Sequence, residues 1–274
     1  MPRTSHLRLG ALLGAALLLL VAPVADAQTT RTVTRSFSLA RTGHVALDTF
    51  TGSINVTGGN RSRVTVKARI EGDDPELVEK TRLRFNDGDD RLSVEVDYDE
   101  VKDSQEFLGL FNIGNVDRPA AHLTIKMPRG AALTVDDFSS EISVTDLHAD
   151  ITLDTFSSPI TLRNVEGAMD LKTFSGEIEG ERLRGRVQLE TFSGEVQLRM
   201  TALTGDSQLE TFSGDIELAL PADAGFELVG EDDAFGELES EFALRAEDGR
   251  RIAGGGGPGI EIETFSGTIQ LRKQ

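Results

Sequence analysis

The sequence predicts an all-β protein, a parallel β-solenoid of the β-helix or β-roll kind with about 18–20 residues per coil and an N-terminal antiparallel β-rich cap. Two observations predict this fold class. A short motif, Thr-Phe-Ser-Gly or a close variant, recurs seven times, and apolar and polar residues alternate around each copy as they do in β-strands. The phenylalanines of the motif are the candidate structural ladder, namely Phe50, Phe138, Phe156, Phe174, Phe192, Phe212 and Phe265.

The spacing of the motif indicates one structural unit stacked on copies of itself. Phe138, Phe156, Phe174 and Phe192 are each 18 residues apart, and the next interval is 20 residues. One coil buries about six apolar side chains, which contribute roughly 9–18 kcal/mol at ~1.5–3 kcal/mol each. Ordering the roughly 18 residues of a coil costs about 27 kcal/mol at ~1.5 kcal/mol per residue. A single coil therefore cannot fold alone, and the coils must stack on one another.

The first residues have the features of a secretory signal peptide. A basic start precedes an apolar run at residues 9–21, and Ala-Asp-Ala at 25–27 forms a small-residue cleavage site. We therefore predict a signal peptide over residues 1–27 and export of the mature chain, from Gln28, to the periplasm or to the cell surface and extracellular space. The alternative is an uncleaved anchor, although 13 apolar residues are few for spanning a bilayer. We expect no transmembrane segment in the mature chain.

Composition excludes several classes of function. The chain carries 46 acidic and 28 basic residues, a formal net charge of −18, which repels phosphate backbones and argues against nucleic acid as a partner. It contains no cysteine, so disulfides, thiol nucleophiles and thiolate metal sites are excluded. The fold must therefore be stabilised by its core and its backbone hydrogen bonds alone.

Residues 28–128 are predicted to form the N-terminal β-rich cap region. They lack the 18-residue period but contain four alternating segments typical of strands, at 31–39, 63–70, 92–96 and 122–127. Residues 75–84 are predicted to form one short helix that begins after Asp74. We expect these strands to begin the solenoid and to cover its first open end, because an uncovered end would pair with other molecules.

Residues 129–274 are predicted to hold the β-solenoid repeats. In one coil, Val187, Leu189 and Thr191 share one side of a strand and are expected to face inward. After Thr191 the alternation shifts by one residue, which predicts a corner at Thr-Phe. The phenyl rings would then stack inside the molecule at one strand spacing, ~4.8 Å. The corner glycine either supplies a backbone angle closed to other residues or leaves room beside the ring, and serine at this position in the early coils favours room. The inward set after the corner is expected to be Phe192, Gly194, Val196 and Leu198.

Two segments depart from the repeat. Residues 226–257 separate the last two copies of the motif, and we expect either an insertion between coils or a coil with a long return loop. Such a segment is either a functional face or a tolerated surface loop. Residues 107–113 are the densest apolar stretch after the signal peptide. They are expected either to fold over the end of the solenoid or to contact a partner or a membrane surface.

Acidic residues are expected to form two outward columns along the stack. Like charges at strand spacing repel unless cations lie between them, so the columns are either weak calcium sites or a solvated face that prevents pairing with other molecules. Apart from this calcium alternative, no cofactor is predicted. Residues 86–90 resemble a calcium loop but lack its spacing, which favours a hairpin turn. The columns are Asp136, Asp154, Lys172, Glu190 and Glu210, and then Glu141, Glu177, Glu195 and Asp215.

The sequence offers no candidate catalytic, cofactor-binding or metal-ligand residue. His44, His122 and His148 have none of the spacings that metal ligands use. The serine of the repeated motif does not lie in a Gly-x-Ser-x-Gly nucleophile elbow. Because the outward acids repeat, they fit a surface better than a single catalytic site. We therefore predict a protein that is not an enzyme, with a glycan-cleaving enzyme on a β-solenoid scaffold as the alternative.

Four features of the sequence occur together in this order. They are the step Met127-Pro128-Arg129-Gly130, the serial T-x-SG-x-I units, Leu220-Pro221, and a glycine-rich segment before Thr264-Phe265-Ser266-Gly267-Thr268-Ile269. With these features the chain resembles the bacterial putative-adhesin family of unknown function over roughly residues 40–274. That resemblance implies an exported or envelope-associated β-solenoid protein with no assigned catalytic residues and no cofactor. We therefore expect a non-enzymatic cell-envelope module for binding or scaffolding, whose partner is an envelope protein or a glycan.

Overall fold

The protein is all-β, as the sequence predicts. The computed structural model describes residues 28–101, 118–230, 237–247 and 249–274. These residues form 22 strands joined in one hydrogen-bonded sheet, together with one short helix. The predicted signal peptide at 1–27 and the apolar segment at 107–113 lie outside the described residues.

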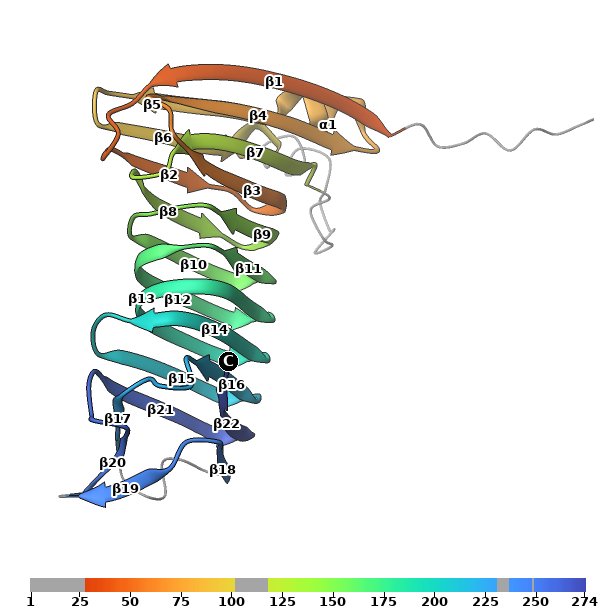
Figure 1. Cartoon of the computed structure of the whole chain (residues 1–274). Helices are drawn as coiled ribbons and strands as arrows, with labels where there is room; N and C mark the ends of the chain where they lie inside the picture. Colours follow the sequence, from red (N-terminus) through yellow and green to blue (C-terminus); the bar gives the residue numbers. More distant parts are fainter. Residues whose placement is uncertain (1–27, 102–117, 231–236, 248) are drawn as a thin grey trace, which may run out of the picture.

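Each repeat contributes two strands, and the repeats lie one on another along a single axis (Figure 1). The first strands of the coils are β2 (His44–Asp48), β8 (Ala132–Asp137), β10 (Ile151–Ser157), β12 (Glu166–Ser175), the second half of β13 (Ile178–Ser193), β15 (Ser207–Ser213) and β21 (Gly259–Ser266). The second strands are β3 (Thr51–Gly59), β9 (Ser139–Thr145), β11 (Ile160–Arg163), the first part of β13, β14 (Val196–Leu203), β16 (Ile216–Leu220) and β22 (Thr268–Lys273).

Neighbouring coils pair in parallel, and equivalent residues of the repeat lie side by side. Leu153 of β10 pairs with Leu171 of β12, which pairs with Leu189 of β13. The second strands follow the same rule, since Ile160 of β11 pairs with Ile178 of β13. A residue type that recurs in the sequence therefore becomes a continuous column in space, one strand spacing per coil.

The core lies between the row of first strands and the row of second strands. Leu171 and Leu189 on the first strands, and Val196 and Leu198 on the second strands, are all buried, as the alternation predicts. Gly180 occupies a position where other coils have an inward leucine. A Cβ atom at Gly180 would lie 2.5 Å from Cδ1 of Leu183, so that side chain already fills the space.

The N-terminal region covers one end of the stack. β1 (Thr29–Ser38), β4 (Arg63–Gly72) and β7 (Ala120–Pro128) pair antiparallel, as do β5 (Arg82–Asp87) and β6 (Arg91–Asp97). β6 and β7 then pair in parallel with β2 and β3, which in turn pair with β8 and β9. The early copy of the motif at Phe50 therefore lies within the stack rather than apart from it.

The helix and the hairpin of this region form where the sequence predicts them. Helix α1 (Pro75–Lys80) begins after Asp74, whose carboxylate accepts a hydrogen bond from the backbone N–H of Glu76 at 2.8 Å. The helix is shorter than predicted because the chain enters strand β5 at Arg82. Residues 86–90 form the turn between β5 and β6, where the Gly88 N–H donates to the Arg91 carbonyl oxygen at 2.8 Å.

The segment at 226–257 covers the opposite end of the stack. It contains β17 (Phe226–Val229), β18 (Glu237–Ser240), β19 (Leu244–Glu247) and β20 (Arg250–Ala253). β17 and β18 pair in parallel with β21 and β22, while β20 pairs antiparallel with β17 and β19. The last coil of the sequence is therefore inserted between β15–β16 and this segment, as Figure 1 shows at the blue end of the chain.

Candidate functional site

The seven phenylalanines of the motif form one continuous row, which we call the phenyl row. Successive ring centroids are 4.6–5.0 Å apart, and the ring planes differ by only 2–9°. These values correspond to stacked rings at the spacing of neighbouring strands. The row runs through every coil from Phe50 to Phe265.

The phenyl row lies on the outside of the molecule, so the inward placement predicted from the sequence is wrong. Phe138 to Phe212 are 42–47% exposed, and Phe265 is 79% exposed. The alternation of the first strand continues one residue further than predicted, with Thr191 buried and Phe192 outward. The corner therefore falls at Ser193–Gly194, after the ring rather than before it.

The glycine of the motif supplies a special backbone angle, which was the less favoured of the two sequence interpretations, and the room it leaves is for backbone and not for a phenyl ring. Gly176, Gly194 and Gly214 have φ angles of 151°, 152° and 149°. A Cβ atom on Gly194 would lie 2.1 Å from the carbonyl oxygen of Gly176 in the preceding coil, and Gly214 has the same relation to Gly194. The corner thus requires glycine both for its backbone angle and for the close approach of successive coils.

A column of charged side chains lies next to the phenyl row on the same outward face. We call it the acidic column, and its members pair one coil with the next. Burial, and then the neighbouring carboxylate of Asp154, raise the pKa of Asp136. Burial, and then Glu210 and Glu261, raise the pKa of Glu263. The acidic column consists of Asp48, Asp136, Asp154, Lys172, Glu190, Glu210 and Glu263.

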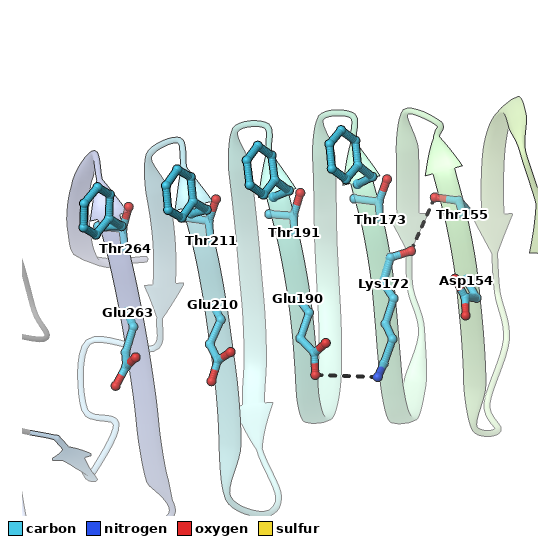
Figure 2. Close-up of a pocket in the computed structure, with 14 residues that line it drawn as sticks. Asp154, Thr155, Lys172, Thr173, Glu190, Thr191, Glu210, Thr211, Glu263 and Thr264 are labelled. Carbon is cyan, nitrogen blue, oxygen red and sulfur yellow. Dashed lines mark hydrogen bonds and ion pairs between the residues drawn. The ribbon is translucent and has the colours of Figure 1, made fainter.

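One cation lies within the acidic column. Lys172 Nζ is 3.6 Å from Glu190 Oε1, and Figure 2 shows this ion pair beside the carboxylates of Glu210 and Glu263. At Asp48, burial, and then the carboxylates of Glu95, Asp136 and Asp137, raise the pKa. The column therefore has more negative charge than its own lysine can balance.

A shallow groove separates the phenyl row from the acidic column. It has a volume of about 730 Å³ and extends over five coils, from Asp154 to Phe265. The acidic column, the threonines of the motif and the phenyl row all line it. Figure 2 shows the threonines Thr173, Thr191 and Thr211 in line between the rings and the carboxylates.

The two ends of the phenyl row differ. At the first end the guanidinium carbon of Arg118 lies 3.9 Å from the ring centroid of Phe50, and Tyr98 meets that ring edge-on at 6.3 Å. The Tyr98 hydroxyl donates to the carbonyl oxygen of Pro119, and burial raises its pKa. At the other end, Phe212 is the one ring of the described residues on which Phe265 stacks. Sequence reasoning missed Arg118 and Tyr98, although Tyr98 is the only tyrosine of the chain.

The outward face of the second strands is charged in a different way. Of the second predicted column, Glu141 lies on β9, whereas Glu177, Glu195 and Asp215 each lie directly before a second strand, where the Glu195 and Asp215 carbonyl oxygens accept hydrogen bonds from the adjacent coil. Beside them, Arg199 lies 3.8 Å from Glu181 and 3.9 Å from Glu217. Arg163 and Arg272 also pair with glutamates of adjacent strands. Exposed ion pairs of this kind are consistent with a solvated face.

Asp137 takes the place of the threonine in one early coil, and sequence reasoning missed it. The Ser140 N–H and hydroxyl donate to its carboxylate at 2.6 and 2.7 Å, and the Ser158 hydroxyl donates to it at 2.8 Å. Burial raises the pKa of Asp137, while these hydrogen bonds oppose the rise. Ser140 and Ser158 stand where later coils have glycine, so the three substitutions form one buried joint between two coils. Their occurrence in adjacent coils was the available sequence signal.

The histidines lie apart from the groove. His44 hydrogen-bonds to Thr134, and His122 hydrogen-bonds to Ser53. Burial, and then nearby arginines, lower the pKa of both rings. Across the described ranges, no three or more His, Asp or Glu side chains are grouped so as to hold a metal ion. Within the same ranges, no helix has the length and apolar character needed to cross a membrane.

Comparison with known families identifies part of the chain. Residues 166–272 match the family model described as Toastrack DUF4097. This match confirms the resemblance to the putative-adhesin family predicted from the sequence. No curated protein matches the chain.

Several solved structures are similar to the chain at low identity. A putative cell adhesion protein from Clostridium sporogenes is 13% identical, with 90% of this chain and 100% of that chain covered and a TM-score of 0.38. A putative adhesin from Bacteroides fragilis is 14% identical, with 89% and 97% covered and a TM-score of 0.39. A putative lipid binding protein from Parabacteroides distasonis is 10% identical, with 88% and 97% covered and a TM-score of 0.32.

Proposed function

Since residues 166–272 match the Toastrack DUF4097 family model, we propose that this protein is an exported, non-enzymatic binding module of the cell envelope, built as a parallel β-solenoid. Its proposed parts are a signal peptide at 1–27, an N-terminal β-rich cap region at 28–128, and solenoid repeats at 129–274 with an insertion at 226–257. Parallel pairing of equivalent residues in successive coils supports the solenoid. The basic and apolar start of the chain supports export to the periplasm or the cell surface.

The observation that carries the binding proposal is the exposure of the phenyl row. Elsewhere the coils bury their aliphatic side chains almost completely, yet a phenyl ring stands outward in every coil. Exposed apolar area costs roughly 25 cal/mol per Å², so a contiguous apolar stripe is unfavourable in water unless something covers it. Such stripes, bordered by polar residues, are typical of interaction surfaces. We infer that the phenyl row and the adjoining groove contact an envelope protein or a glycan.

The alternative function, glycan cleavage, has less support from the groove. Glycosidases place two carboxyl groups in different environments, so that one is an acid while the other is a nucleophile or a base. The carboxylates of the acidic column instead repeat at equivalent positions, and Glu190 and Glu210 pair directly in register. A repeated row of equivalent acids favours binding over catalysis.

The binding proposal is tested by retention of the purified chain on isolated cell envelopes. The variant carries Phe174→Ser, Phe192→Ser and Phe212→Ser, which alter three outward rings and leave the core unchanged. We expect its retention to fall at least tenfold. The matched control carries Thr161→Ala, Gln197→Ala and Gln270→Ala on the second strands and should be retained like the unaltered chain. Unchanged retention of the phenylalanine variant would refute the proposal.

Export is tested separately. The chain with residues 1–27 should be found in the periplasmic or culture fraction, and a chain without them should stay in the cytoplasm. Recovery of both forms in the same compartment would contradict a signal peptide.

A further inference from the structure

We propose that the partner of this surface is a polypeptide segment folded as a cationic amphipathic helix, which lies along the phenyl row. This inference rests on the proposed binding function and names its partner. The apolar side of the helix would cover the exposed ring edges, and its lysines or arginines would lie over the acidic column. Three properties of the surface lead to this partner.

The first property is that the faces of the rings are already occupied. Phe174 and Phe192 are 4.8 Å apart with their planes within 2°, so each covers a face of the other. Arg118 covers the outer face of Phe50. Where the structure describes the chain, one face of the seven rings is therefore left uncovered, that of Phe265. Sugars stack on aromatic faces, whereas this row presents edges. Aliphatic side chains pack against such edges without a preferred orientation. A polypeptide therefore fits the row better than a glycan.

The second property is the uncompensated charge of this face. The acidic column has one ion pair among its members in the described chain, Lys172 with Glu190. On the second strands, by contrast, Arg199 and Arg272 each lie near two glutamates. The carboxylates next to the rings therefore attract cations that the chain itself does not supply. Burial and like charge raise the pKa of Asp136 and Glu263, which agrees with mutual repulsion along the column.

The third property is that the strands beneath the surface are fully paired. β12 pairs with β10 and β13, and β15 pairs with β13 and β21. A partner cannot add a strand here and must bind through side chains. A helix satisfies its own backbone hydrogen bonds and presents one apolar and one charged side. Six ring spacings give a row of roughly 29 Å, the length of a helix of about 19 residues.

Charge argues against two other occupants of this surface. A second copy of the chain would place one acidic column against another, and the whole chain has a net charge of −18. An anionic lipid surface would be repelled for the same reason. Both occupants remain outcomes of the experiments below.

The test measures binding of a labelled lysine–leucine model peptide of about 19 residues, designed as an amphipathic helix, to the full chain at low ionic strength. The charge variant carries Glu190→Gln, Glu210→Gln and Glu263→Gln, all in the acidic column. The matched control carries Glu177→Gln, Glu195→Gln and Asp215→Asn, which remove the same charge from the positions directly before the second strands. We expect the charge variant to raise the dissociation constant of the peptide at least tenfold. The control should raise it less than threefold.

A second experiment tests the contribution of the phenyl rings to peptide binding. The variant with Phe174→Ser and Phe192→Ser should weaken peptide binding at least tenfold without changing its salt dependence, because no charge is removed. A scrambled peptide of the same composition, which cannot form an amphipathic helix, should bind at least tenfold more weakly than the designed one. Equal binding of the two peptides, or equal loss in the two charge variants, would overturn the inference, since the attraction would then be unspecific.

Failure of this inference is distinguishable from failure of the proposed function. If the phenylalanine variant loses envelope retention but the unaltered chain ignores the peptide, the partner named here is wrong while the binding function stands. Envelope retention can also be challenged with competitors. Loss of retention with soluble envelope oligosaccharides would assign the surface to a glycan, loss with anionic vesicles to a lipid, and loss with excess chain to a second copy. Each of these outcomes would overturn the inference. Retention that is insensitive to the rings refutes the function itself.

Discussion

The two outward faces of the coils are built from the same repeat, yet they differ in charge balance and in apolar exposure. The first-strand face carries the phenyl row and the acidic column, with Lys172 as the cation within that column. The second-strand face carries acids next to arginines, such as Arg199 between Glu181 and Glu217. In the described chain, the exposed large apolar side chains are six rings of the phenyl row and Val229. The same repeat thus builds both faces, but among the described residues only the first-strand face combines exposed rings with the excess negative charge of the acidic column, which favours binding of a partner.

The difference arises because inward and outward positions are under different constraints. An inward position of the coil must contain an aliphatic group that fits between neighbours above and below, and it is therefore similar on both strands. An outward position has no such requirement. Packing of the core does not require an outward ring in every coil, so we take the regularity of the rings as evidence of a role beyond their mutual stacking.

The largest effect on the free energy of unfolding is expected in the core, where the first and second strands should contribute equally. Leu189→Ala on a first strand and Leu198→Ala on a second strand each remove a buried leucine, and each should lower the free energy of unfolding by ~2–5 kcal/mol. Urea denaturation measures both. The substitutions Gln188→Ala and Gln197→Ala, at the neighbouring outward positions, should change the free energy of unfolding by less than ~0.5 kcal/mol. A large difference between the two leucine variants would show that the strand rows do not share one core.

A second prediction concerns the corner that joins the two faces. Gly194→Ala would force a side chain into a φ of 152° and against the Gly176 carbonyl oxygen, which costs ~1–3 kcal/mol in backbone strain before the clash is counted. Gly205 has a neighbour at 3.6 Å, so Gly205→Ala should be nearly neutral. Thermal unfolding of the two variants compares them. Equal melting temperatures would mean that the corner tolerates a side chain.

A third prediction measures what the phenyl row contributes to stability. Phe192→Ala removes two stacking contacts of ~0.5–1.5 kcal/mol each, so we expect a loss of about 1–3 kcal/mol. A fully inward ring would cost ~3–5 kcal/mol. Phe265→Ala removes one contact from a ring that is 79% exposed and should cost less than Phe192→Ala. Denaturant titration that ranks Phe265 above Phe192 would contradict the observed stacking.

The smallest expected effect is the change in stability when one charge is removed from either face. The pKa of Asp136 is raised above 3.8 in the folded chain by burial and then by Asp154. Its protonation therefore favours folding below pH 3.8, and this contribution is lost as the pH rises through the folded pKa. Asp136→Asn should then stabilise the chain at neutral pH by less than about 0.5 kcal/mol, since the site is exposed and screened. This gain should vanish below pH 3.8.

The second-strand face should respond in the opposite direction. Glu217→Gln removes a partner of Arg199 and should lower the free energy of unfolding at neutral pH by less than about 0.5 kcal/mol. Calorimetry at neutral pH gives the sign of each change. The same sign for both substitutions would mean that the faces do not differ in charge balance.

Much of the architecture was predictable from local patterns. The 18-residue period predicted parallel pairing of equivalent positions, and Leu189 pairs with Leu171 as expected. Asp74 before a proline predicted the start of the helix. The direction of Phe192 was not predictable in this way, because a corner on either side of the ring fits the alternation of Leu189 and Val196 equally well. The spatial order of the final coils was also not predictable from the sequence, because β21 lies between β15 and β17 although it follows both in the chain.

The sequence by itself determined the strand content, the repeat length and the identity of the inward aliphatic columns, because these follow from periodic burial along a short segment. Only the tertiary structure decided that the rings are outward and that their faces are occupied. Both depend on where the backbone of one coil meets the next, as at Gly194 and Gly176. The charge balance of each face was likewise decided in three dimensions, because Arg199 lies near glutamates 18 residues away on either side of it along the chain.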